Sequence, residues 1–227
     1  MQKKEKERKL GGTVLSHKHS PPKGRTNKLM IRLFTALCKS FFDELSELSG
    51  EQIFQDATDG YNHYGNGCPR CGAVGKLEPH GGYSRWLVHR QKRKAVDSRV
   101  RILRFKCKSC GATHALLPDL LVPRSIYSLQ FKLLALIAYS ERETTVANIC
   151  ESFGIAISTL YEWKKLLVSH IELLVGILMS RKTPALEFLR NLIHSKYLSD
   201  ELQRFFKKYG FSFMQAPPVT AARSNPP

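Results

Sequence analysis

Two short cysteine motifs constrain the fold of this chain more than any other part of its sequence. The first is Cys68-Pro-Arg-Cys71, the second is Cys107-Lys-Ser-Cys110, and a glycine directly follows each pair. A C-x-x-C turn directs both sulfur atoms to one point, and glycine can adopt the left-handed backbone conformation that such a turn often needs. Two turns together supply four thiolates, a donor set that suits tetrahedral Zn²⁺ at about 2.3 Å. We therefore expect one structural zinc ion bound by all four cysteines.

The segment between the two motifs indicates the size of the metal-binding unit. It runs from Gly72 to Lys106 and is longer than the roughly 15 to 20 residues typical of four-cysteine sites. This length predicts a zinc ribbon with an enlarged hairpin. The alternatives are two unrelated surface turns or a redox motif, although a redox C-x-x-C normally occurs once, near a β-α-β pattern. Cys38 and Cys150 fall on apolar helical patterns, so we expect small buried residues there rather than ligands.

Positive charge is concentrated in two segments of the chain. Of the net charge of +17, residues 1–28 contribute +7, from nine Lys or Arg and two Glu, and residues 85–108 contribute +9, from ten Lys or Arg and one Asp. A basic surface that served solubility alone would be spread evenly, so we expect a polyanionic partner, most simply double-stranded DNA. RNA is an alternative. The predicted phosphate contacts are Arg85, Arg90, Lys92, Arg93, Lys94, Arg99, Arg101 and Arg104.

Two strands separated by a polar turn are expected in the ribbon. The strands cover residues 83–89 and 99–107, and the turn covers residues 91–98. In the second strand the alternation of basic and apolar residues changes phase at Ile102 and Leu103. A β-bulge there would place the Arg and Lys side chains in one row that matches a phosphate backbone.

Trp86 and three histidines are further candidates within the ribbon. We expect Trp86 to be buried against the cysteine turns, with stacking on a nucleobase as the alternative. His80, His89 and His114 are each able to act as a base or a ligand, but none has a partner in the sequence pattern. No role is therefore assigned to them.

A second strong pattern follows between Thr144 and Leu167. Thr144 or Thr145 is suited to start a short helix that Gly154 ends, and a second helix begins at about Ile157. Two helices joined by a short turn with glycine, after a preceding helix, are typical of a helix-turn-helix. With Leu160, Trp163 and Leu167 directed inward, the residues predicted to contact bases in the major groove are Ile157, Ser158, Tyr161, Glu162 and Lys165.

Two features weaken this interpretation. Ala156 stands where a capping side chain is usual, which costs about 1 kcal/mol of helix stability. Residues 125–180 also carry four Lys or Arg and five acids, a net charge of −1. The alternative is a helical hairpin that serves only packing.

The predicted fold class is mainly α with a small β zinc ribbon, an α+β arrangement in which the ribbon precedes a three-helix helix-turn-helix unit and C-terminal helices. An apolar connector, residues 116–123, is expected to pack the ribbon onto the helices. The predicted segments are a disordered basic tail (1–28), a helical segment with a helix over 29–48 (29–59), the zinc ribbon (60–115), a helix-turn-helix domain with an extended last helix (116–180), C-terminal helices (181–215) and a disordered tail (216–227).

These motifs together resemble a known group of proteins. The similarity covers about residues 60–170 and lies in Cys68-Pro-Arg-Cys-Gly, Arg104-Phe-Lys-Cys-Lys-Ser-Cys-Gly, His114-Ala-Leu-Leu-Pro and Phe153-Gly-Ile-Ala-Ile-Ser-Thr-Leu-Tyr-Glu-Trp. They resemble the amino-terminal DNA-binding region of bacterial insertion-sequence transposases, and are more similar still to short clostridial proteins that share this region. The resemblance implies a mobile-element origin, residues 156–165 as the recognition helix, and zinc ligands at Cys68, Cys71, Cys107 and Cys110.

We expect no catalytic activity from this chain itself. The carboxylate-triad nuclease domain of such transposases does not carry over to this sequence. Two-metal chemistry needs several carboxylates on one scaffold, and after Ser180 the acids are Glu187, Asp200 and Glu201. Asp200 and Glu201 stand at the start of a predicted helix, where acids stabilise the helix dipole. A zinc ion with four thiolate ligands also has no open position for water.

The remaining expectations concern location and partners. The apolar stretch from Leu29 to Phe42 is interrupted by Arg32 and Lys39, so it predicts neither a signal peptide nor a membrane span, and we expect a cytoplasmic protein without membrane contact. The C-terminal aromatic residues are expected to enter a core or to bind a partner. Besides a DNA-binding protein, the alternatives are a non-catalytic assembly subunit, homo-oligomeric or bound to another protein, and a DNA-binding partner of a separate transposase or nuclease.

Overall fold

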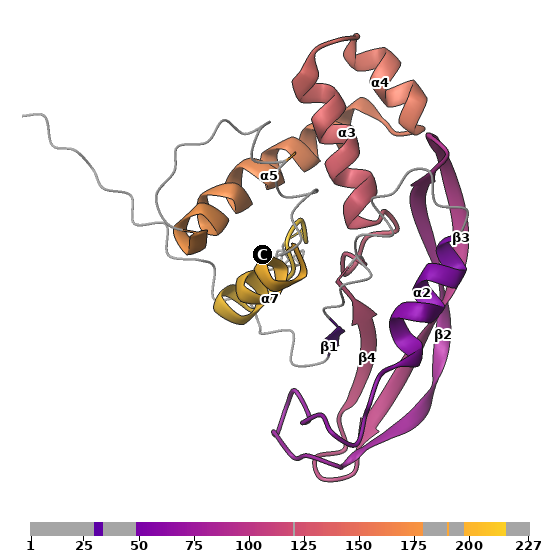
Figure 1. Ribbon diagram of the computed structural model, residues 1–227, viewed down its shortest axis with the longest axis vertical. Coiled ribbons are helices and arrows are strands. Elements are labelled where there is room, and N and C mark those ends of the chain that lie inside the picture. The colour runs from indigo at the N-terminus through magenta and orange to yellow at the C-terminus, as the bar shows by residue number, and fades with distance from the viewer. Residues whose placement is uncertain (1–29, 34–48, 120, 179–189, 191–197, 217–227) are drawn as a thin grey trace, which may run out of the picture.

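A computed structural model describes residues 30–33, 49–119, 121–178, 190 and 198–216 of the chain (Figure 1). In chain order the elements are β1 (Met30–Leu33), α2 (Gly50–Asp59), β2 (Leu77–Gln91), β3 (Lys94–Cys107), β4 (Thr113–Pro118), α3 (Leu129–Glu141), α4 (Val146–Phe153), α5 (Ile157–Leu178) and α7 (Leu198–Tyr209). Across those ranges, none of the helices combines the length and the apolar character that crossing a membrane requires. Cys38, the predicted tail over 1–28, and all of the predicted tail over 216–227 except Ala216 lie outside the described residues.

The strands form one mixed sheet in the order β1-β4-β3-β2. β3 is antiparallel to both β2 and β4, while β1 runs parallel to β4. The predicted fold class, mainly α with a small β ribbon and a three-helix helix-turn-helix unit, is therefore wrong. The physical reason is that the hairpin does not end the sheet, because β4 pairs with its free edge at β3 and β1 then pairs with β4.

β4 covers the end of the predicted zinc ribbon and the start of the segment, residues 116–123, that was predicted to be an apolar connector. Ala115 pairs with Arg104 of β3 on one side and with Met30 of β1 on the other. Leu116 and Leu117 point to opposite faces of the sheet and are both buried. A strand buried on both faces has a nearly continuous apolar sequence, which does not show the alternation of a half-exposed strand.

The predicted helix over residues 29–48 is wrong at its start, because Met30–Leu33 is a strand. Residues 34–48 lie outside the described part of the chain. A helix does follow as α2, which begins with a capping box between Ser49 and Gln52. Its Phe54 packs on Leu87 and Val100, so that α2 lies across one face of the β2–β3 hairpin (Figure 1).

The β2–β3 hairpin is longer than its sequence suggests. Gln91 pairs with Lys94, so the turn consists of Lys92 and Arg93 alone and the predicted eight-residue turn is wrong. Both turn residues have a positive φ, 48° and 61°, as a tight two-residue hairpin turn requires. A bulge is present, but it lies in β2 between Pro79 and Gly82, and β3 is regular from Ile102 to Leu103.

The helices begin and end as their sequences indicate. The side chain of Ser128 accepts a hydrogen bond from Phe131 N–H at the start of α3, and Thr145 does the same for Asn148 at the start of α4. Gly154 ends α4 with a φ of 61°, in the left-handed conformation that glycine adopts at low cost. The predicted start of the next helix at Ile157 is confirmed.

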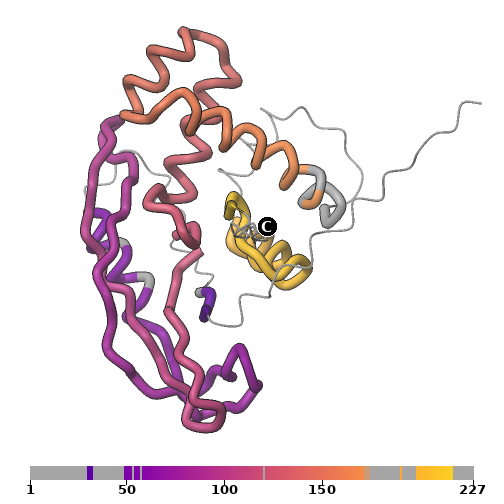
Figure 2. Tube along the Cα trace, turned by 180° about the vertical axis from the view of Figure 1, so that it is seen from behind, coloured from indigo at the N-terminus to yellow at the C-terminus, as the bar shows by residue number. Residues whose placement is uncertain are grey.

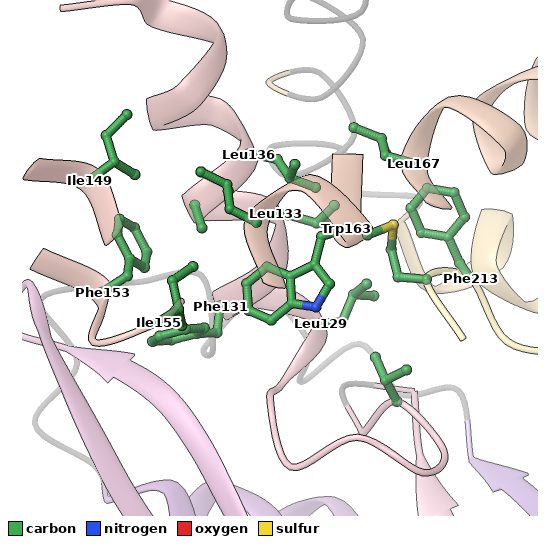
Figure 3. Close-up of a cluster of buried hydrophobic side chains, with 14 of the residues drawn as sticks. Leu129, Phe131, Leu133, Leu136, Ile149, Phe153, Ile155, Trp163, Leu167 and Phe213 are labelled. Carbon is green, nitrogen blue, oxygen red and sulfur yellow. The ribbon is translucent and has the colours of Figure 1, made fainter. Parts of the chain in front are cut away.

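One apolar core joins α3, α4, α5 and α7 (Figure 3). Phe131 lies between the rings of Phe153 and Trp163, with centroid distances of 5.3 and 6.2 Å. Phe213, from the segment after α7, closes the same core, and Val88 of β2 packs against it. Because α7 and the sheet complete this core, α3, α4 and α5 are not the separate three-helix unit that was predicted.

The C-terminal segment also uses its aromatic residues within the chain. Phe205 of α7 is fully buried among Phe211, Phe213 and Tyr209. Lys207 and Lys208 lie in the last turn of α7 and Gly210 follows with a φ of 73°, which is typical of a helix end. The earlier C-terminal helix predicted from Thr183 lies outside the described residues.

Candidate metal centre and nucleic-acid interface

The two cysteine motifs fold into matching turns. In the first, Gly72 N–H donates to Cys68 C=O at 2.8 Å, and in the second, Gly111 N–H donates to Cys107 C=O at 2.9 Å. Each first cysteine also donates its N–H to the carbonyl five residues later, at 3.0 and 2.8 Å. Gly72 and Gly111 have φ values of 77° and 68°, so the predicted left-handed glycines are confirmed.

The four sulfur atoms converge on one point. All four Sγ atoms lie within 4.8 Å of one another. The Sγ of Cys68 is 3.7 Å from that of Cys110, and the Sγ of Cys71 is 3.8 Å from that of Cys107. A tetrahedron with metal–sulfur bonds of about 2.3 Å has edges of about 3.8 Å, whereas a disulfide has sulfurs about 2.05 Å apart. The donor set and spacing fit a metal ion, and the predicted clustering of Cys68, Cys71, Cys107 and Cys110 is confirmed.

The surroundings of the Cys107 sulfur favour its thiolate over its thiol. The backbone N–H groups of Cys110 and Ser109 lower the pKa of the Cys107 thiol to about 7. Cys107 is completely buried and packs with Leu77, Phe105 and Leu116. Lowered thiol pKa values promote metal binding because the thiolate is the ligand.

His114 lies beside the sulfur cluster, although the sequence pattern gave no basis for assigning it a role. Its Nε2 lies 3.2 Å from Cys68 Sγ and its side chain is completely buried. An imidazole N–H at this position stabilises a thiolate and orients it, the role that outer-sphere groups play at metal sites. The available signal was the spacing, because His114 comes four residues after Cys110. His80 is exposed, and His89 is buried against Gly50 of α2, where burial lowers its pKa.

A donor set of four thiolates suits a structural metal ion. Four thiolates complete a tetrahedral shell and leave no position for substrate or water. Among the described residues, these cysteines form the one cluster of three or more His, Cys, Asp or Glu side chains placed to hold a metal ion. Cys150 lies elsewhere, buried in the helical core as predicted.

Two of the predicted phosphate contacts are engaged inside the protein. Arg85 is half-buried and donates hydrogen bonds to the backbone carbonyls of Val122, at 2.8 Å, and Ser125. Arg90 lies over the ring of Phe153, with its Cζ 4.1 Å from the ring centroid. These two residues join β2 to the connector and to α4.

The other basic residues of the hairpin do not form the single row that was predicted. Lys92, Arg93 and Lys94 are exposed at the tip. Arg99 and Arg101 are exposed on one face, while Arg104 lies on the opposite face and is half-buried. The row is broken because β3 has no bulge at Ile102 and Leu103, so the change of phase in the sequence moves the basic residues to the other face.

The residues predicted to contact bases are exposed on α5. The predicted inward positions Leu160, Trp163 and Leu167 are buried, which confirms the orientation of the helix. The outward side chains are those of Ile157, Ser158, Tyr161, Glu162 and Lys165, all exposed. The start of α5 lies beside the basic tip of the hairpin in both views (Figures 1 and 2).

Trp86 is not buried against the cysteine turns. Its side chain is 54% exposed in the middle of β2, so that prediction is wrong. The sequence spacing placed Trp86 near the motifs, but the alternation of the strand directs it to the face that α2 does not cover.

The comparisons with known proteins match the part of the chain that contains both cysteine turns, the hairpin and the start of α5, and they supply no function. A family described as a domain of unknown function (DUF6431) matches residues 68–163. The matched stretch begins at the first cysteine of the sulfur cluster and ends at the buried Trp163 of α5. No curated protein and no solved structure matches the chain. No transposase or helix-turn-helix family is found in these comparisons.

Proposed function

We propose that this protein is a zinc-dependent DNA-binding protein without catalytic activity of its own. The observation that carries the proposal is the placement of the basic hairpin tip beside the exposed start of α5 (Figures 1 and 2). Lys92 to Lys94 and the start of α5 are about sixty residues apart in the sequence, yet the hairpin tip and the start of α5 are neighbours in the fold (Figures 1 and 2). The basic tip supplies the positive charge that the helices themselves lack.

Zinc is the ion that best suits the four thiolates. A tetrahedral four-sulfur shell accepts zinc or iron, and zinc is the usual structural ion. We propose Cys68, Cys71, Cys107 and Cys110 as its ligands, with the ion fixing the ends of β2 and β3. Elemental analysis of purified protein is expected to give one zinc per chain. A red-brown protein with stoichiometric iron would correct the identity of the ion.

The start of α5 contributes a second attraction for phosphate. Ala156, which precedes the helix, has no side-chain acceptor for the N–H groups of the first turn. Such N–H groups and the helix dipole favour an anion. Ala156 is unfavourable for helix stability because it provides no cap. The uncapped first turn therefore supports a phosphate contact at the start of α5.

The transposase resemblance supports DNA as the polyanion and a mobile-element origin. It rests on the two cysteine turns and on the Phe153 to Trp163 run. In this proposal the base-contacting candidates are Ile157, Ser158, Tyr161, Glu162 and Lys165, and the phosphate contacts are Lys92, Arg93, Lys94, Arg99 and Arg101.

Salt-dependent DNA binding tests the proposal. Fluorescence anisotropy with random duplex DNA is expected to show the logarithm of affinity falling by about 0.9 per phosphate contact for each tenfold rise in salt. Arg99→Ala with Arg101→Ala is expected to reduce both the affinity and this slope. Lys207→Ala with Lys208→Ala removes the same charge from α7 and is the matched control. Equal effects of both pairs, or no duplex binding by zinc-loaded protein, would contradict the proposal.

One observation favours an assembly subunit as the second candidate. Ile157, Tyr161 and Val168 are 48%, 45% and 54% exposed and lie along one stripe of α5. Such a stripe suits a contact with another protein or a second copy of this chain. Light scattering is expected to show self-association that Val168→Lys abolishes if this candidate is correct. The C-terminal aromatic residues do not favour it, because Phe205 and Phe213 are buried in the core of the chain itself.

A further inference from the structure

One face of the β2–β3 hairpin carries an exposed aromatic ring between two cationic side chains. Trp86 is 54% exposed, and the guanidinium carbon of Arg99 lies 5.6 Å from the centre of its ring. The strand register pairs Trp86 with Arg99 and Ser84 with Arg101, so all four side chains lie on the same face. Ser84, Arg99 and Arg101 are also exposed. We call these four residues the Trp86 patch.

Two of the apolar clusters of the protein border this patch without covering it. Toward the hairpin tip, Val88 of the same face packs against the helical core. Toward the metal end, Leu103 packs against the cluster that contains Cys68 and Cys107. Trp86 lies between Val88 and Leu103 on this face. Both of those side chains are more buried than Trp86. An indole left exposed in mid-strand is unfavourable for solubility and is typical of a binding contact.

The chemistry of the patch selects a planar, electron-rich ligand with an anionic group nearby. A nucleobase stacks on an indole and on a guanidinium, and its phosphate pairs with a second guanidinium. Asp97, which lies on this face opposite Val88, is the acid nearest in register, two residue pairs further toward the tip. Arg99 and Arg101 outweigh its charge, and the tip adds Lys92 to Lys94. An acidic peptide would satisfy the arginines but would leave the indole without a flat partner.

We propose that Trp86, with Arg99 and Arg101, is a stacking platform for an unpaired nucleobase of single-stranded nucleic acid. The inference rests on the proposed DNA-binding function and deepens it. Bases within a duplex are stacked on one another and do not reach an indole in the middle of a sheet. The platform therefore binds a single-stranded segment that continues from a duplex held at the basic tip and α5, and Arg99 and Arg101 contact phosphates where the duplex passes into the single strand.

The test compares a blunt duplex with the same duplex carrying a single-stranded thymine tail, both bound to zinc-loaded, full-length protein. Stacking of one base stabilises binding by an amount equivalent to roughly 5- to 150-fold in affinity. We expect the tail to raise affinity by about tenfold or more. Trp86→Ala is expected to abolish this gain and to leave the affinity for the blunt duplex unchanged, while Trp86→Phe retains part of the gain.

Tyr83→Ala is the matched control. Tyr83 is 43% exposed on the same strand but lies on the opposite face, since it is three residues from Trp86. This variant is expected to retain the full gain from the tail. Metal content and thermal unfolding verify that each variant is folded.

Intrinsic fluorescence gives a second readout. The chain contains two tryptophans, and the other one, Trp163, is 6% exposed in the helical core. Addition of the thymine tail alone is expected to quench Trp86, and the quenching is lost in Trp86→Ala. Unchanged fluorescence would contradict direct stacking.

The outcomes separate this inference from the proposed function. Salt-dependent binding of the blunt duplex with no gain from the tail would overturn the platform and leave DNA binding intact. Absence of binding to either duplex would overturn both. Self-association that disappears in Trp86→Ala, together with no effect of the tail, would assign the Trp86 patch to a protein contact and overturn the inference.

Discussion

The end of the sheet that carries the four cysteines and the core formed by α3, α4, α5 and α7 differ in how many apolar side chains they bury. Around the sulfurs, the described residues include six buried apolar or cysteine side chains, two of which are candidate ligands. The helical core has eighteen buried apolar residues from four helices and the segments next to them. The smaller cluster buries too little apolar surface to order its loops alone, so we expect a metal ion bound to the four cysteines to supply the missing stabilisation. The hairpin and the helices also differ in net charge, which is +9 in residues 85–108 and −1 in residues 125–180.

Metal removal gives the largest expected difference between the two regions. Zinc bound to four thiolates stabilises small domains by on the order of 10 kcal/mol at neutral pH. Chelation or Cys107→Ser is therefore expected to unfold the cysteine turns and the adjacent ends of β2 and β3 while α3, α4 and α5 remain folded. Hydrogen exchange followed by mass spectrometry measures both regions at once.

Cys150→Ser is the control for that experiment. It removes a buried thiol from the helical core and is expected to keep the metal. Native protection of β3 in metal-free protein would show that the ion does not hold the sheet together.

A substitution in the helical core is expected to destabilise the helices and to leave the metal centre unchanged. Phe131 is completely buried between Phe153 and Trp163, and Phe131→Ala is expected to lower the free energy of unfolding by about 3 to 5 kcal/mol. Denaturant unfolding monitored by Trp163 fluorescence measures this loss. Zinc content is expected to be unchanged, since Phe131 does not contact the cysteine turns. Val168→Ala, at an exposed position of α5, is expected to change stability by less than about 0.5 kcal/mol; loss of zinc in Phe131→Ala would show that the two regions are coupled.

Acid is expected to weaken the helical core through His170. Burial, together with the charge of Lys132, lowers the pKa of His170 to about 4, and its Nδ1 accepts a hydrogen bond from Met214 N–H at 3.0 Å. Between pH 4 and about 6.5 the unfolded chain binds the proton more readily than the folded protein does, so stability falls as the pH decreases through this range. The contribution is complete above pH 6.5 and amounts to about 3 kcal/mol. Urea unfolding at several pH values measures it.

His170→Asn provides the comparison, because its amide oxygen accepts the same hydrogen bond without titrating in this range. We expect this variant to lose less stability between pH 6.5 and pH 4 than the native protein. An unchanged pH dependence would remove His170 from the explanation.

His114→Ala tests the outer sphere of the metal centre. Loss of the imidazole next to Cys68 Sγ is expected to weaken zinc affinity by about 10- to 100-fold. Competition with a chromogenic chelator measures the change, and His80→Ala, at an exposed position, is the control. Equal affinities of the two variants would show that His114 serves packing alone.

The smallest expected effect concerns the hairpin tip. Lys92 and Arg93 occupy left-handed conformations that Asn and Gly adopt more readily. Lys92→Asn with Arg93→Gly is expected to raise stability by about 1 kcal/mol while weakening DNA binding and flattening its salt dependence. Thermal unfolding and anisotropy on the same samples test both statements. Increased stability with unchanged affinity would exclude the tip from the DNA contact.

Local sequence patterns predicted local structure well. The caps at Ser128 and Thr145, the glycine at 154, and the buried positions of α5 all follow from rules that involve a few neighbouring residues. The same holds for the two cysteine turns, where a glycine with positive φ closes each tip. The extent of the sheet did not follow in this way. Pairing of β1 with β4 joins segments more than eighty residues apart, and no local pattern identifies the partner.

The candidate surfaces illustrate the same limit. The sequence identified a basic hairpin, but hydrogen bonds from Arg85 to the connector and the contact of Arg90 with Phe153 occupy two of its arginines. The alternation of β3 then divides the remaining ones between two faces, and it exposes Trp86. Burial depends on what covers each face, which only the folded arrangement of α2 and the helices decides.

By itself, the sequence determined the two cysteine turns as candidate metal ligands, the helix ends and the location of the positive charge, because each depends on residue type and short spacing. Only the tertiary structure decided that His114 joins the sulfurs, that the basic tip lies beside α5, and that the sheet has four strands. These features depend on contacts between residues far apart in the chain, where strand pairing and apolar burial select one arrangement among many that the local patterns allow.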